Sequence, residues 1–219
     1  MRPAPDLRLY LVTDEPQCAS AGRSVLQTVV AAVDGGVTCV QLRAKDTDGG
    51  PFLAQVLEVS RAVGDRVPVI VNDRVDVFLA ARELGAAVAG VHIGQSDLPA
   101  PLVRALIGDD AFLGLSASTD SEIIAAQAEG ACDHLGIGAV HDTATKTDAP
   151  GGLGVAGVAR AASLVGLPAV AIGGVKVPDM APLAAAGLDG GAVVSAICCA
   201  PDPRRAAAEL LAAWTDGLR

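Results

Sequence analysis

Three polar side chains with alternating spacing, Gln41, Arg43 and Lys45, follow a short apolar run and form the clearest candidate anion site. If this segment ends a β-strand, residues two apart point the same way, so an amide and two cations converge on one region. Two like charges at this spacing repel each other unless an anion lies between them, and a polyphosphate group would supply that negative charge. The alternative interpretation is a solvated strand end whose charges are unrelated.

Two aspartates are the candidate metal ligands. Asp73 and Asp97 each follow an apolar run of the kind expected for a buried strand. If the two strands are neighbours, both carboxylates lie close enough to share one cation. Oxygen ligands with water completing the shell suit Mg2+ better than zinc. Both positions also permit a helix N-cap, which is the alternative interpretation.

A polar, glycine-rich segment around Lys146 is long for a strand–helix connection, which is typical of a binding loop. We expect residues 148–154 within it to form a mobile lid. The chain has only three lysines, and two of them, Lys45 and Lys146, lie in proposed site loops. Gly174 and Ser195 follow later apolar runs, where backbone N–H groups commonly hold a phosphate.

Eight short apolar runs alternate with longer helical stretches and would position these groups. The predicted strands cover residues 7–13, 38–43, 67–72, 89–94, 111–116, 133–138, 168–173 and 190–195. The predicted helices cover residues 24–34, 51–63, 75–84, 98–107, 120–129, 155–164, 177–186 and 203–214. Strands that are apolar throughout are typical of parallel sheets covered on both faces. The pattern predicts an α/β fold, a (β/α)8 TIM barrel forming one domain over residues 1–219, rather than an open doubly wound sheet.

Composition narrows the function classes. The 219 residues are 51% hydrophobic but only 2% aromatic, with a net charge of −9, so we expect a folded core and no nucleic-acid or anionic-membrane partner. The longest uncharged stretch, residues 161–175, is shorter than the roughly 20 apolar residues of a membrane span. Asp6 and Arg8 stand where a signal peptide would be apolar, so a cytoplasmic location is expected.

Cysteines and histidines offer no obvious nucleophile. None of the five cysteines has C-x-x-C spacing, so they are interpreted as small buried hydrophobic residues, without disulfides or zinc. The histidines at 92, 134 and 141 form no evident triad and are interpreted as structural. Anion-binding groups and a metal pair without a base favour a reaction in which a diphosphate leaves and charge stabilisation does most of the catalysis.

Eight motifs occur in order along nearly the whole chain: Leu9-Tyr-Leu-Val-Thr-Asp14, Gly35-Gly-Val-Thr-Cys-Val-Gln-Leu-Arg-Ala-Lys45, Val71-Asn-Asp-Arg-Val-Asp76, Gly90-Val-His-Ile-Gly-Gln-Ser-Asp-Leu-Pro99, Gly114-Leu-Ser116, Thr143-Ala-Thr-Lys146, Ala171-Ile-Gly-Gly174 and Val193-Val-Ser195. In these motifs the chain resembles the thiamine-phosphate synthase family. The resemblance implies a (β/α)8 barrel that joins 4-amino-2-methyl-5-hydroxymethylpyrimidine diphosphate to 4-methyl-5-(2-phosphoethyl)thiazole, or its carboxylated form, with Mg2+. It also implies that the C–O bond breaks first, giving a pyrimidine methylene cation that the thiazole nitrogen captures.

The same resemblance implies roles for individual residues. It places the pyrimidine diphosphate at Gln41, Leu42, Arg43, Ala44, Lys45, Asn72, Ser116 and Lys146. It places the thiazole phosphate at Thr143, Ala144, Thr145, Gly174, Val194 and Ser195, and Mg2+ at Asp73 and Asp97. Arg43, Lys45, Ser116 and Lys146 are the expected catalytic residues. The implied partners are small phosphorylated substrates, and the oligomeric state, including a homo-oligomer, stays open.

The chain departs from the family pattern at three places. Ala44 stands where the family usually has Glu, Ser118 where it often has His, and Ala139 and His141 where it commonly has Pro and Phe. Ala44 is expected to affect support of the site more than ligation, whereas the changes over residues 139–142 bear on the thiazole end. Two alternatives stay open: the paralogous thiazole tautomerase, whose chemistry needs a positioned histidine, and a non-catalytic phosphate-binding barrel.

Overall fold

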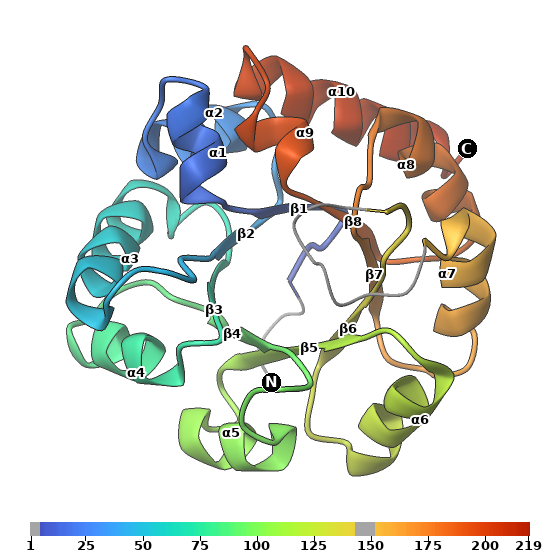
Figure 1. The fold of residues 1–219 in the computed structure, drawn as a ribbon, viewed down its shortest axis with the longest axis horizontal. Helices are drawn as coiled ribbons and strands as arrows, with labels where there is room; N and C mark the ends of the chain where they lie inside the picture. Colours follow the sequence, from blue (N-terminus) through green and yellow to red (C-terminus); the bar gives the residue numbers. More distant parts are fainter. Residues whose placement is uncertain (1–4, 143–151) are drawn as a thin grey trace.

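A closed barrel of eight parallel strands forms the centre of the computed structural model, which describes residues 5–142 and 152–219 (Figure 1). The strands are β1 (Leu9–Val12), β2 (Cys39–Leu42), β3 (Val69–Asn72), β4 (Gly90–Ile93), β5 (Phe112–Ala117), β6 (His134–Gly138), β7 (Ala169–Ile172) and β8 (Gly190–Val193). They neighbour one another in chain order, and β8 pairs with β1 in the register Leu9↔Gly191, which closes the barrel. The predicted (β/α)8 barrel is therefore confirmed, and the open sheet is excluded.

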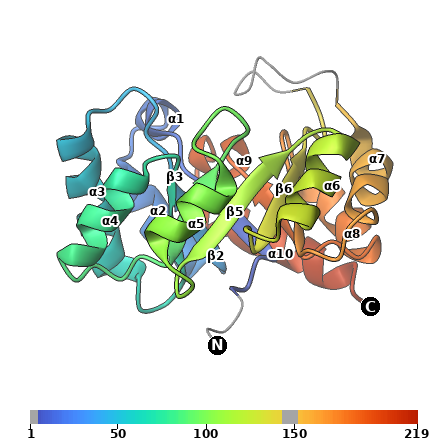
Figure 2. The same cartoon turned by 90° about the horizontal axis from the view of Figure 1, so that it is seen from below.

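Helices surround the barrel and alternate with its strands (Figure 2). They are α1 (Glu15–Ser20), α2 (Val25–Asp34), α3 (Gly49–Val63), α4 (Val75–Glu83), α5 (Ala100–Ile107), α6 (Asp120–Glu129), α7 (Gly154–Ala162), α8 (Val177–Ala185), α9 (Ser195–Cys198) and α10 (Pro203–Asp216). Every predicted helix is present, but α1 and α9 were not predicted. Asp14 caps α1 by accepting a hydrogen bond from the Gln17 backbone N–H at 3.1 Å. Ser195 begins α9, so the predicted strand over 190–195 was too long.

Two apolar layers hold the barrel together. Side chains such as Val40 and Leu42 face the helices and belong to the large core between sheet and helices. Alternate residues, such as Tyr10 and Cys39, face inward and fill the barrel with a smaller cluster. Successive side chains of a strand point to opposite faces, and both faces are buried here. The strands are therefore apolar along most of their length instead of alternating between apolar and polar residues.

Four of the cysteines are buried as expected, but Cys199 is exposed, so the interpretation of it as a buried residue was wrong. It lies just beyond the one-turn helix α9, and its Sγ donates a hydrogen bond to Gln17 Oε1 at 3.2 Å. All five thiols are free. Among the described residues, the helices are too short or too polar to cross a membrane.

Replacing Trp214 with alanine should lower the free energy of unfolding by about 3–5 kcal/mol, the usual cost of emptying a large core site. Trp214 is 1% exposed near the end of α10, which packs on α2 and α8 and so connects the two ends of the chain. Urea unfolding followed by circular dichroism measures the change without using the lost indole. Leu218→Ala, at a side chain 59% exposed, is the control and should change stability little.

Candidate active site

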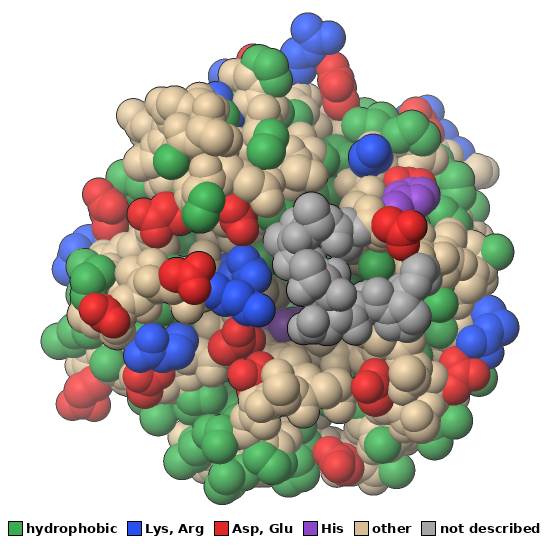
Figure 3. Space-filling model, viewed as in Figure 1, with side chains coloured by type: hydrophobic (Ala, Val, Ile, Leu, Met, Phe, Trp, Pro, Cys, Tyr) green, Lys and Arg blue, Asp and Glu red, His purple; other side chains and the backbone are tan. Residues whose placement is uncertain are grey.

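Most of the polar residues singled out above that the structure describes lie at the end of the barrel where the strands run into the helices. Figure 3 looks into this end and shows basic and acidic side chains together beside a hollow, with a histidine visible inside it. Arg43 follows β2, Asp73 follows β3 and Asp97 lies in the loop after β4, while Ser116 is near the end of β5. The carboxyl ends of parallel barrel strands are where active sites of this fold are built.

Gln41, Arg43 and Lys45 do not form a single row of free donors. Gln41 is buried inside the barrel, where its Nε2 donates to the Tyr10 hydroxyl at 2.9 Å. Arg43 is half-buried, with Nη1 3.3 Å from Asp14 Oδ2, whereas Lys45 is exposed. Asp14 thus holds the Arg43 guanidinium, which relieves part of the repulsion between the two cations.

The two residues between these side chains face the other way. Leu42 is buried in the core between sheet and helices, and Ala44 packs against the same core. Only the backbone of either residue is therefore available to a ligand inside the barrel mouth. The expectation that Ala44 supports the site rather than contacting a ligand through its side chain agrees with this placement.

Asp73 and Asp97 lie side by side, and neither caps a helix. Burial, together with the negative charge and hydrogen bonding of Asp97, raises the pKa of Asp73 to about 6, although a hydrogen bond from Asn72 and the charge of Arg43 oppose the rise. The N-cap positions of α4 and α5 are Arg74 and Pro99, without side-chain capping hydrogen bonds. Asp97 Oδ2 instead accepts the Gly94 N–H at 2.7 Å. The N-cap interpretation was therefore wrong for both.

This pair fits a hard divalent cation. Both donors are carboxylates, and Asp73 adopts φ +59°, a left-handed conformation that Asp tolerates better than most residues. The described residues include no group of three His, Cys, Asp or Glu side chains arranged for a metal, so this pair would supply only part of a coordination shell. Mg2+ commonly uses one or two carboxylates, with water and substrate phosphate oxygens completing its shell.

Ser116 has a partner that sequence reasoning missed. Its Oγ lies 2.9 Å from His92 Nε2, and its carbonyl accepts from Gln95 Nε2 at 2.7 Å. His92 and Ser116 come from neighbouring strands, with His92 opposite Gly114 in the register. His92 and Ser116 are inward-facing positions on adjacent strands, two residues apart in the register. This spacing could have predicted the contact.

The opposite side of the mouth contains the predicted phosphate-binding residues. Gly174 follows β7, while Val194 and Ser195 follow its neighbour β8. Gly174 has φ +74°, and a Cβ there would lie 2.9 Å from the Cβ of His141. His141 Nε2 in turn lies 2.9 Å from Asp179 Oδ1 at the start of α8. His141, which belongs to the segment that departs from the family pattern, therefore packs directly on the loop predicted to bind phosphate.

Part of the predicted site lies outside the described residues. It comprises Thr143, Ala144, Thr145 and Lys146, together with positions 148–151 of the predicted lid. The other residues of the predicted lid, 152–154, lead into α7, where Gly154 is the first helical residue.

Comparison with known sequences identifies relatives along nearly the full chain. The family described as thiamine monophosphate synthase matches residues 9–197. A thiamine-phosphate synthase from Albidiferax ferrireducens is 43% identical over 205 residues, covering 93% of this chain and 90% of the relative. Another, from Xanthobacter autotrophicus, is 46% identical over 209 residues, covering 95% of each chain.

Solved structures give a consistent result. The thiamine phosphate pyrophosphorylase from Pyrococcus furiosus superimposes with a TM-score of 0.86 at 29% identity, covering 98% of both chains. A 3-hexulose-6-phosphate synthase superimposes with a TM-score of 0.71 at 20% identity, covering 94% of this chain and 99% of the other. At that identity the second similarity shows the barrel fold alone.

Proposed function

The chain belongs to the thiamine monophosphate synthase family, and we propose that it condenses 4-amino-2-methyl-5-hydroxymethylpyrimidine diphosphate with 4-methyl-5-(2-phosphoethyl)thiazole, or its carboxylated form, releasing diphosphate and, from the carboxylated form, also CO2. The observation that carries this proposal is the carboxylate pair Asp73 and Asp97 beside Arg43 at the barrel mouth. A carboxylate pair beside a guanidinium suits a diphosphate bound with a divalent cation.

The two substrates would occupy opposite sides of the mouth. Arg43 and Lys45 would contact the diphosphate, with Asn72 and Ser116 on the pyrimidine side. Gly174, Val194 and Ser195 would hold the thiazole phosphate together with residues 143–145, and Lys146 would join Arg43 and Lys45 at the diphosphate. Backbone N–H groups at strand–helix junctions are common phosphate donors in this fold. Asp14 would keep Arg43 in place before the substrate arrives, because it already binds the guanidinium at 3.3 Å.

Asp73 and Asp97 would hold Mg2+. When bound, the ion supplies positive charge to the diphosphate oxygens, which makes diphosphate a better leaving group. Burial and the neighbouring carboxylate both disfavour the charged form of Asp73 in the free protein. A dication between the two carboxylates would remove this repulsion, so the pair is well suited to binding one.

The proposed reaction breaks the C–O bond between the pyrimidine methylene carbon and diphosphate, and the thiazole nitrogen then forms a C–N bond to that carbon. The thiazole nitrogen has no proton to lose, so the condensation needs no general base. It does need positive charge near the departing oxygen, and Arg43 and Lys45 would supply it. A site rich in cations and carboxylates therefore suits this reaction.

The isomerase alternative requires an acid/base residue in the loop after β5. That loop contains Ser118, whose backbone N–H donates to Glu122 Oε2 at 2.7 Å at the start of α6. Glu122 belongs to the capping box of α6 with Thr119, so the loop is shaped by helix capping. A serine hydroxyl is a weak acid and base near neutral pH, and the structure therefore favours the condensation.

Incubation of the purified chain with both substrates tests the proposal. We expect equimolar diphosphate and thiamine phosphate in the presence of Mg2+, and loss of both products when EDTA removes the ion, restored by excess Mg2+. Formation of product at an unchanged rate in EDTA would contradict the metal assignment. Binding of both substrates without product would support the non-catalytic barrel, and isomerisation of the carboxylated thiazole phosphate without diphosphate release would support the tautomerase.

A further inference from the structure

The hydroxyl of Ser116 forms a hydrogen bond with His92, a residue that has no role in the proposed reaction. His92 is 6% exposed inside the barrel, and its Nε2 lies 2.9 Å from Ser116 Oγ. Ser116 is half-buried at the mouth, on the side proposed for the pyrimidine. A serine hydroxyl rotates freely unless a neighbour restrains it, so this contact limits the directions in which Ser116 can donate or accept.

Two glycines provide the space that this histidine occupies. A Cβ at Gly114 would collide with His92 Nδ1 and would lie 2.5 Å from Cε1 of the His134 ring. A Cβ at Gly136 would lie 3.3 Å from His92 Cε1. Interior positions of a barrel are normally filled by side chains, and here the two imidazole rings fill the space that side chains at the two glycines would occupy.

The His92 ring also packs against a second imidazole, that of His134. The centroid of the His134 ring lies 5.5 Å from that of the His92 ring and 6.1 Å from that of the Tyr10 ring. Gln41 donates to the Tyr10 hydroxyl at 2.9 Å. These side chains form a continuous row across the barrel from β2 to β5, ending at Ser116.

This polar row is unusual for a barrel interior. The neighbouring inward-facing residues, such as Ile70 and Val170, are aliphatic and avoid the cost of burying polar atoms. His134 is 2% exposed, and among the described residues its ring nitrogens have no hydrogen-bond partner. Burial lowers its pKa to about 4, so it packs against His92 as a neutral ring. Within this row, His92 is therefore the imidazole whose hydrogen bond connects it to the mouth.

We propose that His92 is a positioning residue, which orients the Ser116 hydroxyl toward the pyrimidine substrate through its Nε2 and is itself held by His134 and the space at Gly114 and Gly136. The proposal rests on the proposed function, because the pyrimidine contact of Ser116 belongs to it. His92 acts only through Ser116, so its effect on the reaction should disappear when the hydroxyl is absent.

A double-mutant cycle tests this dependence. We expect His92→Phe and Ser116→Ala each to lower kcat/KM for the pyrimidine diphosphate by about tenfold, the effect of losing one oriented hydrogen bond. The double variant should be no more than about twofold slower than Ser116→Ala, because coupled residues are not additive. His92→Gln, whose amide can reach the hydroxyl, should recover to within about threefold of the wild-type kcat/KM.

Ile70→Val is the matched control, because it also changes a buried, inward-facing side chain of the barrel but one outside the row that ends at Ser116. We expect it to leave kcat/KM within about twofold of wild type. If His92→Phe does not fold, the cycle is completed with His92→Gln, His92→Leu and Ser116→Ala. Losses that multiply in the double variant, or a His92 variant with wild-type kcat/KM, would overturn the positioning role. A wild-type chain that makes no thiamine phosphate would overturn the proposed function and this role with it.

Discussion

Replacing Asp73 with asparagine should lower kcat for thiamine phosphate formation by at least about 100-fold, the scale of losing one preorganised group that stabilises charge in the transition state. Asparagine keeps the size and one oxygen of the side chain but removes its negative charge. The other proposed ligand, Asp97, already accepts the Gly94 N–H through one oxygen, so Asp97 alone would bind a dication weakly. Both Mg2+ affinity and the rate should fall.

The same substitution should not weaken the fold. Asp73 adopts φ +59°, and asparagine is among the few residues that tolerate this left-handed conformation. Burial and Asp97 both disfavour the charged form of Asp73, so loss of the charge removes an unfavourable interaction in the metal-free protein. We expect a free energy of unfolding equal to or higher than that of the wild type when Mg2+ is absent.

Isothermal titration with Mg2+, steady-state kinetics and urea unfolding together separate these effects. Asp76→Asn is the control: it removes a carboxylate three residues away whose side chain is 66% exposed and paired with Arg74. An exposed pair of this kind contributes about 0–1 kcal/mol, and its loss should leave the rate unchanged. An Asp73→Asn variant with a near-wild-type rate would show that this carboxylate does not bind the catalytic metal.

The barrel could be predicted from the sequence because the features that identify its strands and helices are local. Each parallel strand is an apolar run covered on both faces, and some helices begin and end at recognisable signals, such as the capping box of Thr119 and Glu122 and the C-cap glycine Gly130 at α6. The two helices that were missed are short. α9 is a single turn, and a segment of four residues has too little periodicity to separate it from the end of a strand.

The sequence predicted which residues lie at the site better than it predicted their hydrogen-bond and ion-pair partners. Alternation correctly indicated that Gln41 points into the barrel, and the order of the strands predicted that Asp73 and Asp97 would be neighbours. It could not show that Gln41 bonds Tyr10 or that Asp14 holds Arg43, since these contacts join residues about thirty positions apart. Such pairings depend on register and strand twist, which follow from the whole barrel.

Replacing Arg43 with methionine should lower kcat/KM for the pyrimidine diphosphate by about 100-fold or more, because it removes a cation from the point where negative charge develops on the leaving oxygen. Methionine keeps the apolar stem that passes along the barrel mouth. The Arg43 side chain is 18% exposed and its partner Asp14 is 13% exposed, so the guanidinium acts where water screens it only partly. The fold should lose only about 1 kcal/mol, since Asp14 continues to cap α1.

Asp14→Asn distinguishes charge from orientation at Arg43. It keeps the N-cap, because asparagine caps helices as well as aspartate, but it releases the guanidinium. We expect a smaller loss, about tenfold in kcat/KM, since the cation remains but is no longer held in place. Inorganic diphosphate, titrated with Mg2+ present, should bind the Arg43→Met variant more weakly than the Asp14→Asn variant.

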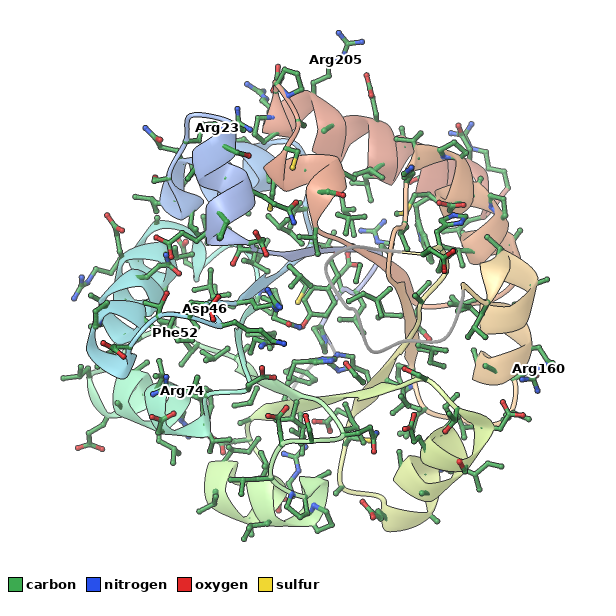
Figure 4. All side chains as sticks on the ribbon, viewed as in Figure 1. Arg23, Asp46, Phe52, Arg74, Arg160 and Arg205 are labelled. Carbon is green, nitrogen blue, oxygen red and sulfur yellow. The ribbon has the colours of Figure 1, made fainter. Side chains whose placement is uncertain are left out.

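Arg160→Met provides the matched control for these measurements. Arg160 projects from α7 at the periphery of the barrel and pairs with Asp120 at 2.7 Å, with 59% of its side chain exposed (Figure 4). Its loss removes the same charge from the molecule, so any general effect of net charge on an anionic substrate appears in this variant too. Equal losses of kcat/KM in Arg43→Met and Arg160→Met would assign the effect to long-range attraction. A loss confined to Arg43→Met places the diphosphate at the mouth of the barrel beside Asp73.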